Sequence, residues 1–130
     1  MPSLDVLVQA KGGPQVHFTG IVDSGASRTV LSITNATKLG LGQDDLTDAG
    51  TVTVADESHV TCLTPLIPIR AQVLQKSSPG SDLIPWGPVF DLDVVFLQHA
   101  TPLWGQTDLF QRFKITFERY LNPQRFSLSY

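Results

Sequence analysis

GIVDSGASRTVLS (residues 20–32) places a single carboxylate inside a stretch of apolar and small residues. An apolar pair precedes Asp23, as the end of a buried strand would, and Ser24 and Gly25 follow it directly. A carboxylate carried into a core is costly unless it has partners. The stretch is therefore either an exposed turn, in which Asp, Ser and Gly are common, or the position of a functional acid.

Length and composition predict one globular domain over residues 1–130. The chain has 130 residues, of which 42% are hydrophobic and 16% charged, and its formal net charge is −3. This is the size of one ordinary domain, with enough apolar residues to form a core. Lys and Arg are scattered, so we expect no nucleic-acid partner. No apolar stretch reaches membrane-spanning length, so we expect no membrane partner either.

The cysteine count and the N-terminal segment bear on location and metal binding. Cys62 is the single cysteine, which excludes an internal disulfide and a multi-cysteine zinc site. The first ten residues do not have the pattern of a signal peptide. We therefore expect a cytoplasmic protein. The three histidines are far apart in sequence without ligand spacing, and no metal or other cofactor is expected.

Alternating apolar residues predict many short strands and two short helices. The helices are predicted at residues 32–40, with Ser32 as N-cap and Gly40 as the end, and at residues 107–113. Residues 75–88, which include Trp86, are rich in Ser, Pro and Gly and predict a surface loop. The strands are predicted at residues 3–9, 15–23, 51–62 (two strands around a turn at 55–58), 66–73 (an edge strand), 90–97, 114–117 and 125–130. This pattern predicts an all-β domain, closed or sandwich-like.

The opening motif resembles the active-site turn of aspartic proteases, Asp-Thr/Ser-Gly. Ala26 after the glycine is similar to the retropepsin branch, the retroviral-type proteases. A second motif agrees, since Leu103, Trp104 and Gly105 resemble the apolar-apolar-Gly element beside the catalytic turn in that family. VTVADESHV (residues 52–60) resembles the flap hairpin of retroelement proteases. Together these motifs are more specific than any one of them.

The resemblance implies a closed retropepsin-like barrel with a flap hairpin and one or two short helices. It implies an aspartic endopeptidase that hydrolyses an extended peptide or protein substrate. Two carboxylates must share one water and one proton, but the chain carries one Asp-Ser-Gly, so the resemblance implies a homodimer. The catalytic residues would be Asp23, Ser24 and Gly25. The substrate-binding residues would be Ala26, Ser27, Ala55, Asp56, Glu57, Ser58, Leu103 and Trp104.

Four residues depart from the family pattern. Gln106 replaces the usual arginine, and Ser27 replaces the acid with which that arginine pairs in retroviral members. Trp104 is bulky for its place, and Glu57 stands where related flaps often have glycine. These departures leave open a catalytically weak or inactive module that dimerises or binds peptides. A second alternative is an unrelated β-barrel binding protein in which Asp23 is a turn residue.

Another acidic pair requires a separate interpretation. Asp91 and Asp93 share one face of the strand predicted at 90–97, which would suit an acid pair. Alternation of polar and apolar residues is, however, the ordinary pattern of a half-exposed strand. We therefore interpret these two carboxylates as a solvated strand face.

Overall fold

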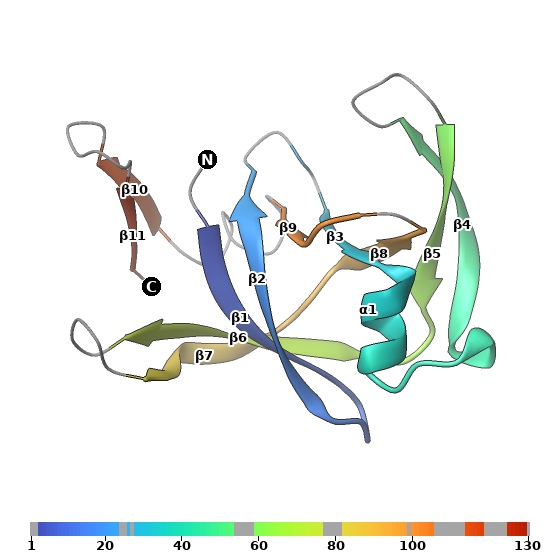
Figure 1. The fold of residues 1–130 in the computed structure, drawn as a ribbon, viewed down its shortest axis with the longest axis horizontal. Helices are drawn as coiled ribbons and strands as arrows, with labels where there is room; N and C mark the ends of the chain where they lie inside the picture. The colour runs from blue at the N-terminus through green and yellow to red at the C-terminus, as the bar shows by residue number, and fades with distance from the viewer. Residues whose placement is uncertain are drawn as a thin grey trace.

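A computed structural model describes residues 3–23, 26, 28–53, 59–76, 82–98, 100–105, 114–118 and 125–129. Within these residues the chain is mostly β-structure, with one short α-helix, α1 (Ile33–Lys38), and a 3-10 helix at Gln43–Asp45 (Figure 1). The strands are β1 (Ser3–Ala10), β2 (Gln15–Val22), β3 (Thr29–Ser32), β4 (Leu46–Thr53), β5 (His59–Pro65), β6 (Ile69–Lys76), β7 (Leu83–Asp91), β8 (Val94–Leu97), β9 (Leu103–Trp104), β10 (Lys114–Glu118) and β11 (Arg125–Ser129). The predicted all-β class is confirmed, whereas closure into a barrel stays a prediction.

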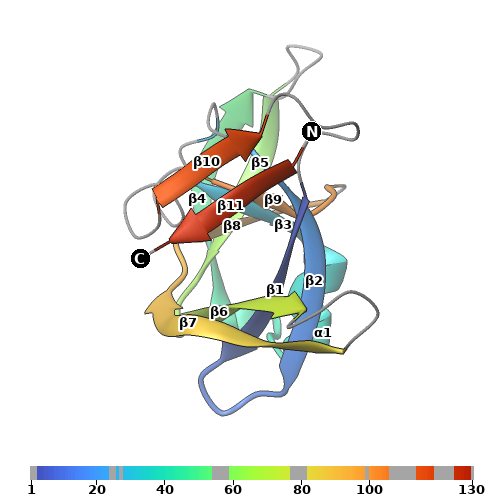
Figure 2. The same cartoon turned by 90° about the vertical axis from the view of Figure 1, so that its left-hand side faces the viewer.

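Most of the strands form one sheet with the order β4-β5-β8-β3-β9-β2-β1-β6-β7, and β10 pairs with β11 in a separate sheet. Figures 1 and 2 show the β4–β5 hairpin at one end of the large sheet, and β6 and β7, at the other end of the strand order, crossing β1 and β2. Within the described residues, no helix is long and apolar enough to cross a membrane.

The alternating pattern of β1 is borne out by its burial. Leu4, Val6 and Val8 are buried, whereas the residues between them are more exposed. β1 pairs antiparallel with β2 on one side and with β6 on the other. A central strand buries one face against the core and leaves the other to solvent, which is the arrangement that alternation predicts.

Helix α1 begins and ends as predicted from the sequence. The Ser32 hydroxyl accepts a hydrogen bond from the backbone N–H of Asn35 at 3.0 Å, and the Asn35 side chain accepts one from the Ser32 N–H at 2.9 Å. This reciprocal capping satisfies two N–H groups that the first turn leaves unpaired. Gly40 has φ +83° just beyond the helix, a conformation that favours glycine.

β9 is the shortest strand and lies in the middle of the sheet. It pairs in parallel with β2, with Ile21 opposite Leu103, and antiparallel with β3, where Val30 lies opposite Leu103. Figure 1 shows β9 between the end of β2 and the start of β3. The segment that joins β2 to β3 therefore has β9 between its two ends.

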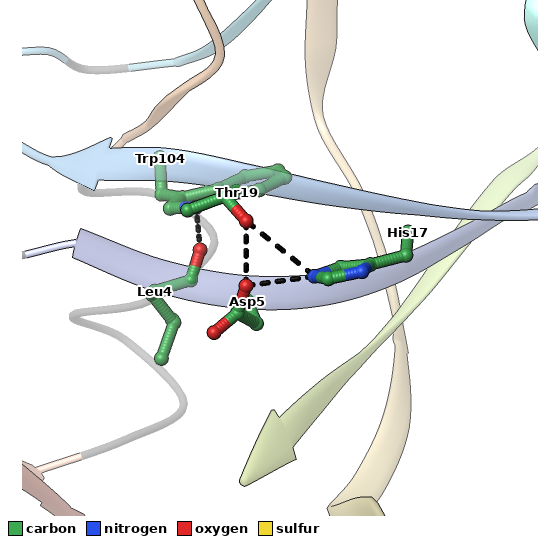
Figure 3. Close-up of polar contacts among 5 residues, drawn as sticks. All are labelled: Leu4, Asp5, His17, Thr19 and Trp104. Atoms are coloured by element: carbon green, nitrogen blue, oxygen red, sulfur yellow. Dashed lines mark hydrogen bonds and ion pairs between the residues drawn. The ribbon is translucent and has the colours of Figure 1, made fainter. Parts of the chain in front are cut away.

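Trp104 of β9 anchors this strand to the core. Its side chain is 1% exposed, and its indole Nε1 donates a hydrogen bond to the carbonyl of Leu4 at 2.9 Å (Figure 3). Leu4 lies opposite Gly20 in the β1–β2 ladder. A Cβ at Gly20 would lie 2.8 Å from that Nε1, so the missing side chain makes room for the indole. The bulky Trp104 side chain, one of the departures from the family pattern, is therefore part of the core.

Three sequence-based boundaries in the second half are wrong. β6 begins at Ile69, after the prolines, and lies between β1 and β7, so it is not an edge strand. Residues 83–88 belong to β7 rather than to a surface loop, and Trp86 packs half-buried against the core. The strand predicted at 90–97 is interrupted between β7 and β8, at residues 92 and 93. Non-local pairing with β6 and β3 decides these boundaries, and local composition does not report it.

Of the remaining predictions, two are confirmed and one concerns residues outside the described part of the chain. The strands on both sides of the turn at 55–58 form the predicted hairpin, with Thr53 paired to His59. The terminal strands at 114–117 and 125–130 are confirmed as β10 and β11. The second helix, predicted at residues 107–113, lies outside the described part of the chain.

Replacing Trp104 with Phe should destabilise the protein by about 1–3 kcal/mol, because it leaves a small void and removes the indole N–H that donates to the Leu4 carbonyl. Urea unfolding measures the change. Trp86→Phe is the matched control, since Trp86 is only half-buried, and it should cost less. Equal losses in the two variants would contradict an anchoring role for Trp104.

Candidate active site

Asp23 directly follows β2 and is half-buried. Its backbone N–H donates a hydrogen bond to the carbonyl of Trp104 at 3.1 Å, and its own carbonyl accepts one from the N–H of Ala26 at 3.2 Å. The first bond extends the parallel β2–β9 pairing by one residue, and the second closes a turn. The backbone of Asp23 is therefore held from both sides, which limits the positions open to its carboxylate.

Thr29, six residues after Asp23, is also held in place by the end of β9. The side chain of Thr29 is 0% exposed, and its hydroxyl accepts a hydrogen bond from the N–H of Gly105 at 3.2 Å. A Cβ on Gly105 would lie 2.3 Å from the carbonyl carbon of Arg28, closer than side-chain atoms can approach. Gly105 is thus required because the two backbones touch here. One short strand therefore holds both ends of the segment 23–29, which we call the Asp23 loop.

Arg28 and Asp93 form an ion pair at the end of the Asp23 loop. Arg28 Nε and Nη2 donate to the same Asp93 oxygen, Oδ1, at 3.0 and 2.7 Å. The carbonyl of Asp93 also accepts a hydrogen bond from the N–H of Thr29 at 3.1 Å. This corrects the interpretation of Asp91 and Asp93 as one solvated strand face, because the strand breaks between them and Asp93 has a specific partner.

Sequence reasoning missed the partnership of Arg28 and Asp93. β3 and β8 are parallel neighbours, with Thr29 opposite Val94, so the residues that precede the two strands lie side by side. An arginine before one short apolar strand and an aspartate before another is the signal that was available. It becomes informative only once the parallel pairing is known, because the two segments are distant in sequence.

The structure brings together only some of the predicted site residues. Ala26 and Leu103 are half-buried near Asp23, at the turn and in the strand beside it. Trp104 contributes its backbone carbonyl to the Asp23 loop, whereas its side chain is buried. Seven predicted residues lie outside the described part of the chain: Ser24, Gly25, Ser27, Ala55, Asp56, Glu57 and Ser58.

The hairpin predicted as a flap stands on the same side of the molecule as Asp23. In both views β2 ends, and Thr53 of β4 pairs with His59 of β5, toward the same end of the molecule (Figures 1 and 2). β4 carries a register shift between Asp48 and Thr51, with Gly50 at φ +100°. Such a bulge bends an edge strand and increases its twist.

A separate polar cluster occupies the outer face of the β1–β2 hairpin. Asp5 Oδ1 accepts a hydrogen bond from the Thr19 hydroxyl at 2.6 Å and lies 2.7 Å from His17 Nε2 (Figure 3). Both neighbours contact the same carboxylate oxygen, and the Thr19 hydroxyl donates to it rather than to the imidazole. Within the described ranges, no group of three or more His, Cys, Asp or Glu residues is placed to hold a metal ion.

Gly105→Ala should destabilise the protein by at least about 2 kcal/mol, because the added methyl group must push β9 away from the Arg28–Thr29 peptide. Chemical unfolding measures the loss. Gly42→Ala is the matched control, since Gly42 has φ −100° and its nearest neighbour would lie 3.8 Å away, so it should change stability little. An equally small effect at Gly105 would contradict the close approach of β9.

A family comparison and a structure comparison each found known proteins that are similar to this chain. The protein family described as aspartyl protease matches residues 6–74, which include most of β1, all of β2, Asp23 and the hairpin predicted as a flap. A crystal structure of a retropepsin-like aspartic protease from Rickettsia conorii is similar, with 21% sequence identity, a TM-score of 0.49, and coverage of 89% of this chain and 73% of that chain. No curated protein matches the chain significantly.

The family match extends over more than half of the 130 residues and contains the half-buried acid at the end of its apolar strand. This chain therefore belongs to the aspartyl protease family.

Proposed function

We propose that this protein is an aspartic endopeptidase whose active site forms between two copies of the chain, each of which contributes Asp23. The observation that carries the proposal is the hydrogen bond from the Asp23 N–H to the Trp104 carbonyl, at 3.1 Å, which holds an acid at the end of an apolar strand within a matched aspartyl protease sequence. An acid in an ordinary surface turn would not need a neighbouring strand to hold its backbone.

The dimer follows from the chemistry and from the number of motifs. One carboxylate, ionised, takes a proton from a water molecule, whose oxygen attacks the carbonyl carbon of the scissile peptide bond. The second carboxylate, protonated, donates a hydrogen bond to the carbonyl oxygen. The resulting tetrahedral intermediate collapses when the first carboxyl group passes the proton it took from water to the peptide nitrogen, and the carbon–nitrogen bond breaks to release the amine. Each chain has one Asp-Ser-Gly, so two chains supply the pair.

In the proposed complex an extended peptide lies between the Asp23 loop and the β4–β5 hairpin. An extended segment can pair its backbone with exposed strand edges, and the pockets between alternate side chains then set specificity. Ser24 would hold the two Asp23 loops together, and Gly25 would let the substrate backbone approach. The residues of the hairpin turn, 55–58, would close over the substrate.

Asp23→Asn should abolish Asp-dependent cleavage, lowering kcat/KM for a peptide from a mixed substrate pool by at least about a thousandfold, because an amide cannot take the proton from water. The fold should be retained, since the hydrogen bonds that tie Asp23 to Trp104 and Ala26 use its backbone, which the substitution leaves unchanged. Cleavage is measured by mass spectrometry of the products, beside circular dichroism spectra of both proteins.

Asp44→Asn is the matched control for this experiment. Asp44 is an exposed carboxylate in the 3-10 helix Gln43–Asp45, and its loss should leave cleavage unchanged. A statine-type transition-state mimic should inhibit the wild-type protein. Near wild-type turnover by the Asp23→Asn protein would show that the assignment is wrong, and a folded dimer without any cleavage would favour the peptide-binding module.

The dimer makes a second, independent prediction. Specific activity should fall on dilution at the concentration where sedimentation shows the dimer dissociating, because a single chain carries half of the carboxylate pair. Adding an excess of the Asp23→Asn protein should lower the activity of the wild-type chains by forming mixed dimers. Full activity in a monomer at every dilution would rule out a shared site.

A further inference from the structure

The Asp23 loop is held at its far end by a contact that involves two consecutive residues. Asp93 accepts from the Arg28 guanidinium with its side chain, at 3.0 and 2.7 Å, and from the Thr29 N–H with its backbone, at 3.1 Å. The two acceptors of Asp93 thus bind Arg28, the residue before β3, and Thr29, the first residue of β3. This arrangement fixes the direction in which the loop enters the strand.

The peptide group between Arg28 and Thr29 is also in contact with the end of β9. Gly105 lies so close to the Arg28–Thr29 peptide that a Cβ on it would be 2.4 Å from the Arg28 carbonyl oxygen. The residue before it, Trp104, accepts the hydrogen bond from the Asp23 N–H. A shift of Arg28 therefore displaces β9, and β9 in turn holds Asp23. Close-packed backbones transmit such shifts because they leave no void to absorb them.

We propose that the Arg28–Asp93 ion pair is a positioning pair: it fixes the far end of the Asp23 loop and thereby sets the position of the Asp23 carboxylate in the active dimer. This inference rests on the proposed function. Neither residue needs to touch the substrate for this role, because the ion pair acts through the Thr29–Gly105 and Asp23–Trp104 hydrogen bonds.

The solvent exposure of the ion pair distinguishes a positioning role from a contribution to global stability. The side chains of Arg28 and Asp93 are 38% and 44% exposed, and ion pairs of such exposure contribute little to global stability. Removing the charge should lower the melting temperature by less than about 5 °C. Misplacement of a catalytic group by a fraction of an ångström to an ångström has a much larger effect on rate. Activity and stability should therefore respond to a very different extent.

The experiment uses Asp93→Asn and Arg28→Gln, each of which removes one charge and keeps a similar shape. Both variants should lower kcat by about tenfold to a hundredfold with little change in KM. The double variant should be no worse than either single variant, since the two act through one contact. Arg28→Lys, which keeps the charge without the guanidinium geometry, should fall between the wild-type protein and Arg28→Gln.

The chain offers a matched control in the Arg70–Asp91 pair. Arg70 Nε lies 3.8 Å from Asp91 Oδ1, the side chains are 70% and 79% exposed, and the pair joins β6 to β7. Asp91→Asn removes the same charge two residues from Asp93, but from an ion pair that lies between β6 and β7. It should leave kcat unchanged.

Amide hydrogen exchange gives a second measurement that does not depend on protease activity. In Asp93→Asn and Arg28→Gln, the amides of Asp23, Thr29 and Gly105 should exchange at least about tenfold faster, and in Asp91→Asn they should not change. Unchanged exchange at these amides would overturn the proposal, and so would faster exchange with unchanged kcat. If the wild-type protein has no Asp23-dependent cleavage, the proposed function fails, and exchange alone decides whether the pair fixes the loop.

Discussion

The two-residue strand β9 is the constraint on which the candidate site depends. It lies between β2 and β3 and accepts the Asp23 N–H through the Trp104 carbonyl, and Gly105, the residue that follows it, donates to the Thr29 hydroxyl. The loop that carries the acid is thereby held at both ends by one short segment from much later in the chain. This arrangement explains how the chain places a carboxylate at the end of a buried strand. The acid is half-buried, and its backbone rather than its charge is built into the sheet.

Two glycines allow β9 to reach this position. Gly20 leaves space for the Trp104 indole, which crosses β2 to the carbonyl of Leu4 on β1, and Gly105 leaves space for the backbone of Arg28 (Figure 3). A methyl group at either glycine would lie 2.8 Å or less from another atom. The large buried indole anchors β9, and the missing side chains of the two glycines leave room for the indole and for the backbone of Arg28. Packing of this kind determines position more sharply than hydrogen bonds alone.

The departures from the retropepsin pattern gain a physical context from the Arg28–Asp93 pair. The resemblance has an arginine after the apolar-apolar-Gly element that pairs with an acid two residues beyond the catalytic glycine, and this chain has Gln106 and Ser27 there, both outside the described residues. Arg28, which follows Ser27, forms an ion pair with Asp93, which precedes β8. A charged contact at the loop is therefore present in this protein, with the cation on the loop and the acid on the neighbouring strand.

The sequence by itself determined the features that depend on neighbouring residues: the alternation of β1, the capping box and glycine end of α1, and the hairpin on both sides of residues 55–58. It also placed Asp23 at the end of a strand and identified Leu103, Trp104 and Gly105 as the element beside it. Only the tertiary structure decided the course of β6 and β7, the burial of Trp104 and the pairing of Arg28 with Asp93. These features depend on parallel and inserted strands whose partners are far apart in the chain. Local periodicity reports which face of a strand is buried, but it carries no information about which distant strand lies beside it.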